Sequence, residues 1–252
     1  MKHFLYILLF ITSTLSSQNV DSLFDEANEL YKNEQFEKAI ENYKQIESRG
    51  FVSSELFYNL GNSYYKLNKV GPSIYYYEKA LKLNPLNKDV QNNLVFARRL
   101  ALDNIEELPK TVFQKLNSRY LQKLSYNQWA IVSIVFCVMG SLLFLLFYFS
   151  NQPRSKRTFF VTSLISFLFL IISLTITYNQ FSYFKNKKVA IVFAEETEVR
   201  NAPSLNSEEV FTLHEGTKVI VLDTIDDWKK IKIADGKIGW IIADDIQLLD
   251  NF

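Results

Sequence analysis

Two long stretches without charged residues lie in the middle of the chain. Trp129–Phe149 and Thr158–Tyr178 each run for 21 residues without an Asp, Glu, Lys or Arg. A helix of this length measures about 32 Å, close to the ~30 Å hydrocarbon core of a bilayer. Because the backbone finds no water in lipid, a continuous helix is the favoured state of each stretch. The sequence therefore predicts transmembrane helices at 129–149 and 158–178. A buried helix in a soluble core is the alternative.

The segment between the two stretches predicts a short connection. Asn151-Gln152-Pro153 is a poor place to continue a helix, because proline has no backbone N–H to donate. The loop at 150–157 also carries three basic residues, Arg154, Lys156 and Arg157. Cytoplasmic loops favour such positive charge. Neither stretch holds the ionisable residues that transport inside a membrane requires, so we expect an anchor.

The N-terminus has the pattern of a secretory signal. Lys2 forms a short positive region, Phe4–Ile11 is apolar, and Thr12–Ser17 is rich in small residues that suit cleavage before Gln18. We therefore expect a signal peptide at 1–17, with an uncleaved anchor as the alternative. Either outcome exports the residues that follow, and two further crossings return the chain to the same side. The prediction is an inner-membrane protein with both soluble parts in the periplasm.

Past the signal, the chain repeats itself at an offset of 34 residues. Ala27–Lys32 (ANELYK) aligns with Gly61–Lys66 (GNSYYK), and Tyr43 aligns with Tyr77. A unit of this length built from two helical patterns resembles the tetratricopeptide repeat. The resemblance implies an all-α repeat domain at 20–106, with units at 20–53 and 54–87 and a capping helix at 88–105. Because two units and a cap are few for a free-standing array, we expect this domain to lean on a partner or on the membrane.

The resemblance also implies a groove for extended peptides along the first helix of each unit. An asparagine amide in such a groove can satisfy the donor and the acceptor of a bound peptide backbone together. Carried onto this chain, the groove positions are Asn28, Tyr31, Lys32, Asn59, Asn62, Tyr65, Lys66 and Asn93. The alternative is that these residues are ordinary solvated positions of the helix surface.

The segment at 110–127 predicts an amphipathic juxtamembrane helix. Lys115, Arg119 and Lys123 follow one another at four-residue spacing, while apolar residues follow another face. A helix of this kind lies in the headgroup region with its cations toward lipid phosphates. A plain solvated connector helix is the alternative.

From residue 188 onward the pattern changes to short β-type runs. Five of them stand between turn residues, at 189–192, 210–213, 218–222, 228–233 and 238–241. Five short strands in about 60 residues predict a small barrel. This part resembles the bacterial SH3-like module, because Glu198–Ser204 (EVRNAPS) is similar to its opening segment and Asp235–Ile241 (DGKIGWI) to its ending. The domain is expected at 188–250.

Two tryptophans of this β-type part are candidates for binding. Trp228 and Trp240 are candidates for an aromatic ligand face, with a place in the core as the alternative. His214 stands beside a turn and is expected to be a solvated residue without a second metal ligand.

No pattern in the sequence is typical of catalysis. A Gly-rich phosphate loop, a His-Glu-x-x-His helix and a nucleophile elbow are all missing, and the adjacent carboxylate pairs are typical of solvated turns. The net charge of +1 and the dispersed basic residues do not indicate a nucleic-acid partner. We therefore expect no catalytic residues, no metal, no cofactor and no nucleic acid. An enzyme of unrecognised type is the alternative.

The order of the parts is similar to that of the BatE type of the Bat aerotolerance group. The predicted fold class is a multidomain membrane protein with an all-α helical repeat, a two-helix transmembrane hairpin and an all-β SH3-like barrel. The resemblance covers the whole chain and rests on this architecture. It implies a membrane-anchored periplasmic scaffold that binds membrane proteins of the same complex, of the von Willebrand factor A type, under oxidative or envelope stress. A protein that binds or senses peptidoglycan through the barrel is the alternative.

Overall fold

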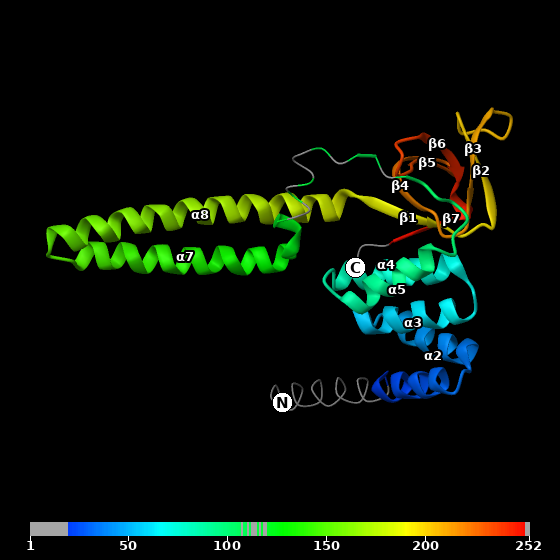
Figure 1. Ribbon diagram of the computed structural model, residues 1–252, viewed down its shortest axis with the longest axis horizontal. Coiled ribbons are helices and arrows are strands. Elements are labelled where there is room, and N and C mark those ends of the chain that lie inside the picture. The colour runs from blue at the N-terminus through cyan, green and yellow to red at the C-terminus, as the bar shows by residue number, and fades with distance from the viewer. Residues whose placement is uncertain are drawn as a thin grey trace, which may run out of the picture. The chain divides into compact units, whose positions relative to one another are not determined.

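The computed structural model describes residues 20–106, 108, 109, 111, 115, 117 and 120–249 (Figure 1). The predicted signal peptide at 1–17 lies outside these residues, and so do residues 110, 112–114, 116, 118 and 119 of the predicted helix at 110–127. The chain forms two compact units. One joins the residues up to Leu108 with those from Lys188 onward, and the other consists of Pro109–Lys187. The first unit therefore combines the helical repeats with the C-terminal sheet, and the second is the apolar hairpin.

Helices form the N-terminal part of the first unit. The chain is helical from residue 20 to residue 32, and four helices follow: α2 (Phe36–Ser48), α3 (Ser54–Lys66), α4 (Val70–Leu83) and α5 (Lys88–Arg98). The side chain of Ser53 caps α3 by accepting a hydrogen bond from the N–H of Leu56 (3.0 Å). Helix α5 ends at Arg98, before the end of the predicted capping helix at 105, because the residues that follow turn to contact the sheet.

Small residues stand where the helices approach each other most closely. Ala27, Ala39 and Ala80 are fully buried. A Cβ added to Gly61 would lie only 2.6 Å from the ring of Tyr77. Interiors pack at crystal-like density, so the ring of Tyr77 occupies the space that a larger residue at 61 would need. The repeat therefore depends on glycine at this position.

An antiparallel sheet of seven strands forms the rest of the first unit. The strands are β1 (Lys188–Val192), β2 (Glu196–Arg200), β3 (Glu209–His214), β4 (Lys218–Ile225), β5 (Trp228–Lys232), β6 (Ile238–Ile242) and β7 (Ile246–Leu248), with a 3-10 turn, η2 (Ala243–Asp245), before β7. Their order is β3-β2-β6-β5-β4-β1-β7. The five predicted strands are present, and β2 and β7 were not predicted. Strand β2 buries only Thr197 and Val199 between charged residues, and β7 has three residues, so neither forms an apolar run.

Strand β1 is buried on both of its faces. Ala190 and Val192 belong to the core of the barrel, whereas Ile191 is fully buried in the core of the helices. Val189 and Phe193 pack against the helical core beside it. Successive side chains of a strand point to opposite faces, so one apolar run serves two cores. The helical repeats and the barrel are joined through this strand.

Polar contacts surround the shared strand. Glu78 of α4 is buried and pairs with Lys218 of β4 (2.7 Å) and with Arg98 of α5 (2.5 Å). Burial alone would raise the pKa of Glu78, but the two cations outweigh it and lower that pKa. The turn after β3 also contacts α4. Gly216 has a φ of +88°, and a Cβ there would lie 2.9 Å from Ile74.

Asp103, in the segment after α5, forms another attachment between the helices and the barrel, in addition to strand β1 and Glu78. Its Oδ2 accepts hydrogen bonds from the N–H of His214 (2.8 Å) and from Oγ1 of Thr217 (2.5 Å), and its Oδ1 lies 2.7 Å from Nδ1 of His214. Partial burial would raise the pKa of Asp103, but these hydrogen bonds outweigh it and lower that pKa. The prediction that His214 is a solvated residue is wrong, because Asp103 holds its ring at this junction with the side chain 30% exposed.

The second unit is a pair of long apolar helices, α7 (Tyr126–Phe149) and α8 (Pro153–Asn186). A 3-10 turn, η1 (Leu121–Lys123), precedes α7, and Ser125 and Gln128 form a capping box at its start. Both helices extend beyond the predicted ranges 129–149 and 158–178. The connection is shorter than the predicted loop at 150–157, because Pro153 begins α8 at a position where a helix tolerates proline.

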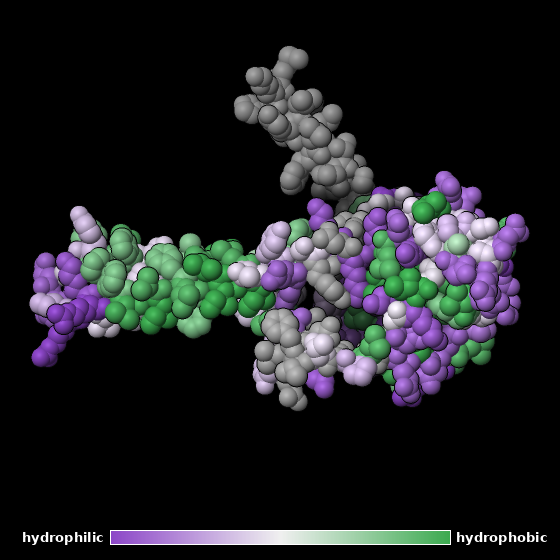
Figure 2. Space-filling model, turned by 90° about the horizontal axis from the view of Figure 1, so that it is seen from above, coloured by the Kyte–Doolittle hydropathy of each residue, from purple (hydrophilic) through white to green (hydrophobic). Residues whose placement is uncertain are grey.

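Small residues line the contact between the two helices. Serine hydroxyls donate across it: Ser133 Oγ to Ser173 Oγ (2.9 Å), Ser163 Oγ to the Gly140 carbonyl (3.0 Å) and Ser166 Oγ to the Phe136 carbonyl (2.9 Å). The remaining surface is apolar along most of the hairpin, with hydrophilic residues at its turn (Figure 2). Both helices are long and apolar enough to cross a membrane. Soluble proteins do not keep an apolar surface of this extent in water, so lipid is the solvent that suits it.

We predict that Asp103→Asn lowers the free energy of unfolding at pH 7 by roughly 1–3 kcal/mol, because the hydrogen bonds from His214 and Thr217 lose a charged acceptor. The folded-state pKa of Asp103 is lowered, so its contribution is present above the unfolded value near 4 and is lost as the pH falls through the folded value. The difference between wild type and variant should therefore shrink below about pH 4. The difference in the free energy of unfolding is measured by urea unfolding of the full-length protein in detergent, monitored by tryptophan fluorescence.

Asp244→Asn is the matched control for this prediction, because Asp244 is exposed in the same barrel. Its unfolding curve should overlay that of the wild type. Equal stability of Asp103→Asn and the wild type at pH 7 would show that Asp103 does not fasten the two parts.

Candidate functional site

In the first repeat, the predicted groove residue Asn28 accepts two hydrogen bonds. Its Oδ1 accepts from Oη of Tyr43 in α2 (2.6 Å) and from Nδ2 of Asn59 in α3 (2.9 Å). Asn28 and Asn59 lie on the first helices of successive units, 31 residues apart. These contacts join two predicted groove residues directly.

The second repeat has the same arrangement. Oδ1 of Asn62 accepts from Oη of Tyr77 in α4 (2.7 Å) and from Nδ2 of Asn93 in α5 (2.8 Å). Nδ2 of Asn93 also donates to Oη of Tyr58 (3.1 Å). Each pair of asparagines forms a rung, and the two rungs together form an asparagine ladder. Its members are Asn28, Asn59, Asn62 and Asn93.

The ladder leaves one amino group and one amide oxygen without a hydrogen bond in each rung. Within the described residues, Nδ2 of Asn28 and Oδ1 of Asn59 make no hydrogen bond, and the same holds for Nδ2 of Asn62 and Oδ1 of Asn93. Every buried side-chain nitrogen or oxygen in that part of the chain has a partner, so these atoms face solvent. A peptide backbone offers one acceptor and one donor per residue, which is the complement of a rung.

Buried tyrosines hold the ladder in one orientation. Burial raises the pKa of Tyr43 and of Tyr77 well above the ordinary value, so both hydroxyl groups stay protonated. A protonated hydroxyl keeps donating to the asparagine oxygen, which turns the amino group of the same amide outward. The open donors of Asn28 and Asn62 are therefore fixed by the core.

The other four predicted groove residues flank the ladder. Tyr31 is half-buried and packs edge-on against Phe36, with 5.3 Å between ring centres, and Tyr65 is half-buried against the helical core. Lys66 and Lys32 are exposed, and Nζ of Lys32 lies 2.7 Å from Glu29. Residues three and four positions apart share a helix face, so Asn28, Tyr31 and Lys32 lie on the same side. The structure brings the four asparagines together and leaves the lysines at the exposed edge.

On the barrel, the two predicted tryptophans lie on the same face of β5 and β6. The strand register pairs Trp228 with Ile242 and Lys230 with Trp240, and the alternate residues face the barrel core. Nζ of Lys230 lies 5.8 Å from the centre of the Trp240 ring. Trp240 is only 8% exposed, whereas Trp228 is half-buried. Of this pair, Trp228 is the one that a ligand can reach.

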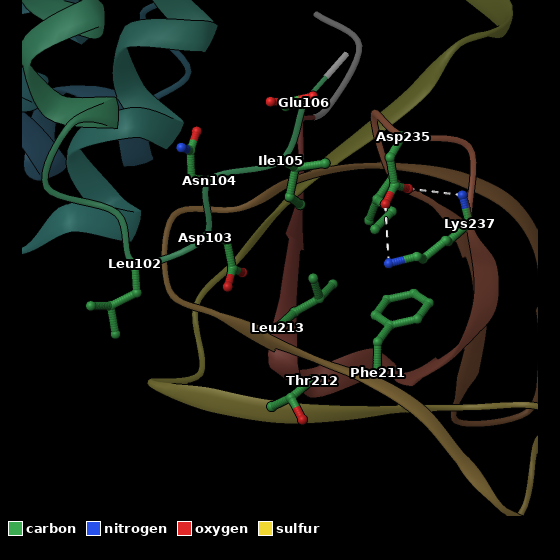
Figure 3. Close-up of a pocket in the computed structure, with 11 residues that line it drawn as sticks. Leu102, Asp103, Asn104, Ile105, Glu106, Phe211, Thr212, Leu213, Asp235 and Lys237 are labelled. Carbon is green, nitrogen blue, oxygen red and sulfur yellow. Dashed lines mark hydrogen bonds and ion pairs between the residues drawn. The ribbon is translucent and has the colours of Figure 1, made fainter. Parts of the chain in front are cut away.

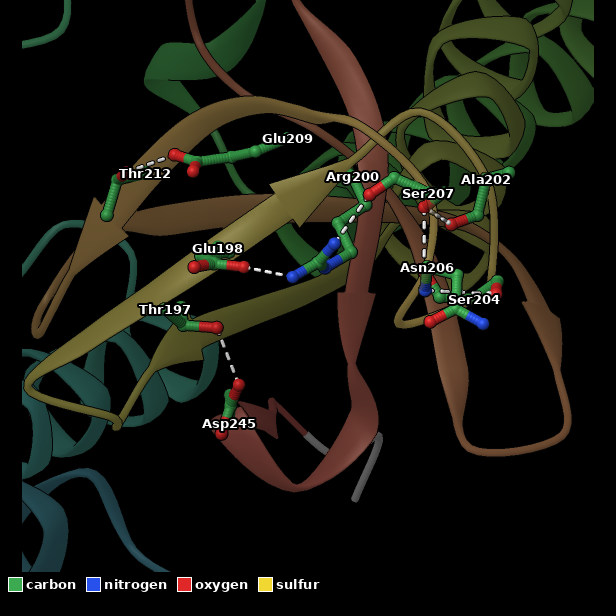
Figure 4. A network of polar contacts seen from close by, with 10 residues as sticks. All are labelled: Thr197, Glu198, Arg200, Ala202, Ser204, Asn206, Ser207, Glu209, Thr212 and Asp245. Carbon is green, nitrogen blue, oxygen red and sulfur yellow. Dashed lines mark hydrogen bonds and ion pairs between the residues drawn. The ribbon is translucent and has the colours of Figure 1, made fainter.

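Polar contacts shape the β2–β3 hairpin beside this face (Figure 4). Arg200 stands opposite Trp240 in the sheet. Its guanidinium donates to the carbonyl of Ser207 (2.5 Å) and pairs with Glu198. The charge of Arg200 is therefore used to hold the loop at 201–208 and is not presented to a ligand.

One member of the acidic turn pairs, Asp245, has a structural partner. Oγ1 of Thr197 donates to Oδ2 of Asp245 (2.5 Å), which ties β2 to the turn η2 (Figure 4). Within the part of the chain that the structure describes, no three His, Cys, Asp or Glu side chains stand together so as to hold a metal ion.

Four residues that make these contacts were not identified from the sequence: Tyr43, Tyr77, Glu78 and Asp103. Asn28 precedes Tyr43 by 15 residues and Asn62 precedes Tyr77 by the same number, so this constant spacing could have shown the hydrogen-bonded pairs. The contacts of Glu78 and Asp103 with the barrel span 140 and 111 residues. Contacts at such separation leave no local pattern.

Comparisons with known families match two parts of the chain. Residues 54–87 match the tetratricopeptide repeat, and residues 195–247 match the bacterial SH3 domain. The comparison with curated proteins gave no match. The fold class predicted from the sequence is confirmed: a helical repeat region, two long apolar helices and a small SH3-like barrel. Both matched families are typically interaction modules without catalytic activity.

We predict that Tyr77→Phe lowers the free energy of unfolding by about 0.5–1.5 kcal/mol, because Asn62 loses one hydrogen bond without any loss of volume. Asn62→Ala should then cost less in the Tyr77→Phe background than in the wild type, since the two side chains share this bond. Urea unfolding of the four proteins of this double-mutant cycle measures the coupling. Tyr65→Phe serves as the control, and additive effects of Tyr77→Phe and Asn62→Ala would rule out the ladder as a coupled network.

Proposed function

We propose that this protein is a membrane-anchored scaffold that binds extended segments of protein partners along its asparagine ladder. The observation that carries the proposal is the recurrence of an open donor and an open acceptor in both rungs, 34 residues apart. A partner held in this way is recognised through its backbone, and the flanking Tyr31, Tyr65, Lys32 and Lys66 read its side chains. The match of residues 54–87 to the tetratricopeptide repeat supports such a role.

The proposed location is the inner membrane with both soluble parts in the periplasm. Support for a common side comes from the first unit, in which Ile191 and Leu249 from beyond the hairpin complete the core of the helices that precede it. A shared core requires both segments in one compartment. The two apolar helices and the match to a bacterial SH3 domain support an envelope location.

The biological setting proposed is a complex for aerotolerance or envelope stress, of the kind that the BatE resemblance implies. The partners would be membrane proteins of the same complex, including those of the von Willebrand factor A type. The order of the parts supports this setting: helical repeat, hairpin and barrel follow each other as in that group.

We predict that the combined change Asn28→Ala, Asn62→Ala and Tyr65→Ala lowers partner capture roughly tenfold or more, because two backbone hydrogen bonds and one ring contact are lost. The measurement is quantitative capture of cross-linked partners from native membranes by the tagged full-length protein. Asn92→Ala is the matched control, since Asn92 is exposed on α5 next to the ladder residue Asn93. Undiminished capture by the triple variant, with its melting temperature retained, would reject the ladder as the binding surface.

Binding of the cell wall through the barrel is the second candidate function. The match of residues 195–247 to a bacterial SH3 domain and the accessible edge of Trp228 favour it. Sedimentation with purified peptidoglycan separates the two. In the wall-binding case the full-length protein cosediments and Trp228→Ala abolishes this, whereas the ladder variant cosediments like the wild type.

We predict that Asn33 and Asn206 face the same compartment and that Lys156 faces the other. Asn33→Cys in the repeats, Asn206→Cys in the barrel and Lys156→Cys at the hairpin turn are placed singly in a Cys137→Ser background, all at exposed positions. A membrane-impermeant maleimide added to spheroplasts should label the first two variants and spare the third until the membrane is opened. Labelling of only one of the two domain variants would overturn the common side.

A further inference from the structure

The segment that follows α5 runs along the barrel (Figure 3). We define residues 102–106 and 108 as the strap. Ile105 packs against the barrel core, and the N–H of Leu108 donates to the carbonyl of Ala234 (3.2 Å). The side chain of Leu108 lies over Gly236, where an added Cβ would be 3.0 Å from its Cδ1. Together with Asp103, these contacts attach the strap at three points.

A groove of about 350 Å³ lies between the strap and the barrel. Its barrel side consists of Phe211 and Leu213 of β3, Ile233, and the turn residues Asp235 and Lys237. Figure 3 shows Phe211 and Leu213 on one side of this space, with Asp235 and Lys237 across from the strap. Nζ of Lys237 lies 3.3 Å from Asp235 and 5.8 Å from the centre of the Phe211 ring. The groove therefore has an apolar floor and one ion pair at its edge.

The strap shows what chemistry this groove accepts. Residues 103–106 are neither helix nor strand, so a segment without regular secondary structure lies on the barrel beside the groove. An acidic side chain at 103 accepts from the amide and hydroxyl donors of His214 and Thr217, and an apolar side chain at 105 packs against the barrel core. The backbone N–H at 108 donates to the carbonyl of Ala234 in the turn between β5 and β6. In the recognition of extended peptides, main-chain hydrogen bonds provide affinity and pockets for single side chains provide specificity.

We propose that the barrel surface under the strap, together with this groove, is a peptide-binding site that the chain's own strap fills only in part. Its ligand is an extended segment with an acidic residue, an apolar residue two positions later and a second apolar residue three positions after that. This inference rests on the proposed function of the barrel as an interaction module. It adds a site distinct from the Trp228 face, and it names the chemistry of the partner.

Apart from Asp103, the strap is attached to the barrel by side chains that are only partly buried. Leu108 is 55% exposed and Leu102 is 76% exposed, while Ile105 is only partly buried. Its advantage over an external segment is its covalent attachment, which gives an effective concentration on the order of millimolar for a short connection. A partner segment of the same pattern binds once the strap leaves, and the strap begins directly after α5, which carries the ladder residue Asn93.

The test uses a labelled peptide with the sequence of residues 102–108, LDNIEEL, titrated into the full-length protein in detergent and followed by fluorescence anisotropy. The variant Ile105→Asp with Leu108→Asp frees the groove, because a carboxylate does not enter an apolar site. It should bind the peptide at least about tenfold more tightly than the wild type, in which the strap competes. Leu100→Asp is the matched control, since Leu100 is exposed and lies outside the strap, and it should bind the peptide as weakly as the wild type.

A peptide carrying the same two substitutions should not bind any of the proteins. If the double Asp variant fails to fold, Ile105→Ala with Leu108→Ala replaces it, with the same expected direction. Equal affinity of the wild type and a folded strap variant for the peptide, or no binding by that variant, overturns the proposal. Partner capture by the asparagine ladder is measured separately, so failure of one proposal leaves the other intact.

Discussion

Strand β1 places Ile191 in the core of the helices and Ala190 and Val192 in the core of the barrel. Full burial of an aliphatic side chain contributes roughly 1.5–3 kcal/mol, and a domain is stable by only about 5–15 kcal/mol, so contacts of this kind decide whether a small unit folds. Two repeats and one further helix leave a side of α4 uncovered. Ile191, Phe193 and Leu249 cover it. The barrel thereby acts as the structural end of the repeat array, a position that terminal capping elements occupy in other solenoids.

The position of the hairpin in the chain gives this arrangement a consequence for folding. The two segments that share a core are separated by both apolar helices, and contacts between them span 111 to 167 residues. Closing a contact over such a distance costs chain entropy before the contact can form. The helices around α4 therefore complete their core only after the second apolar helix and the barrel have been made. The anchor and the soluble unit are coupled in assembly although each has its own core.

How far the sequence predicts this structure depends on whether a pattern is local. Several patterns are local, and each corresponds to an element of the structure. They are the two uncharged stretches, the 34-residue repeat, and the alternating runs at 210–213, 218–222, 228–233 and 238–241. The burial of strand β1 on both faces could also have been predicted from the sequence. Its run at 189–193 is apolar at every position, whereas Lys229, Lys230 and Lys232 interrupt β5, and an unbroken run is typical of a strand that is buried on both faces. Strand β2 was missed because its exposed positions are charged.

The candidate site was predictable in its residues but not in its connections. The asparagines were found through the repeat register, and all four lie in the ladder. The sequence did not show that a tyrosine from the second helix of the unit already binds the amide oxygen of Asn28 and of Asn62. The predicted groove assigned both the oxygen and the amino group of each amide to the ligand. Asp103 and His214 carry no local pattern that links them. A carboxylate after a helix and a lone histidine beside a turn are common surface features, and only the tertiary contact gives them a role.

The hydrogen bonds inside the ladder change what the groove can recognise. Because Tyr43 and Tyr77 hold the asparagine oxygens, each rung has one fixed donor and one fixed acceptor, and little side-chain entropy is lost when a ligand binds. Under the proposed function, a fixed pair of this kind would match any extended backbone and so provide affinity without sequence preference. Specificity would then have to come from the flanking tyrosines and lysines, which differ in exposure, and from the barrel. Such a scaffold would divide recognition between a rigid backbone-reading face and a barrel that reads side chains.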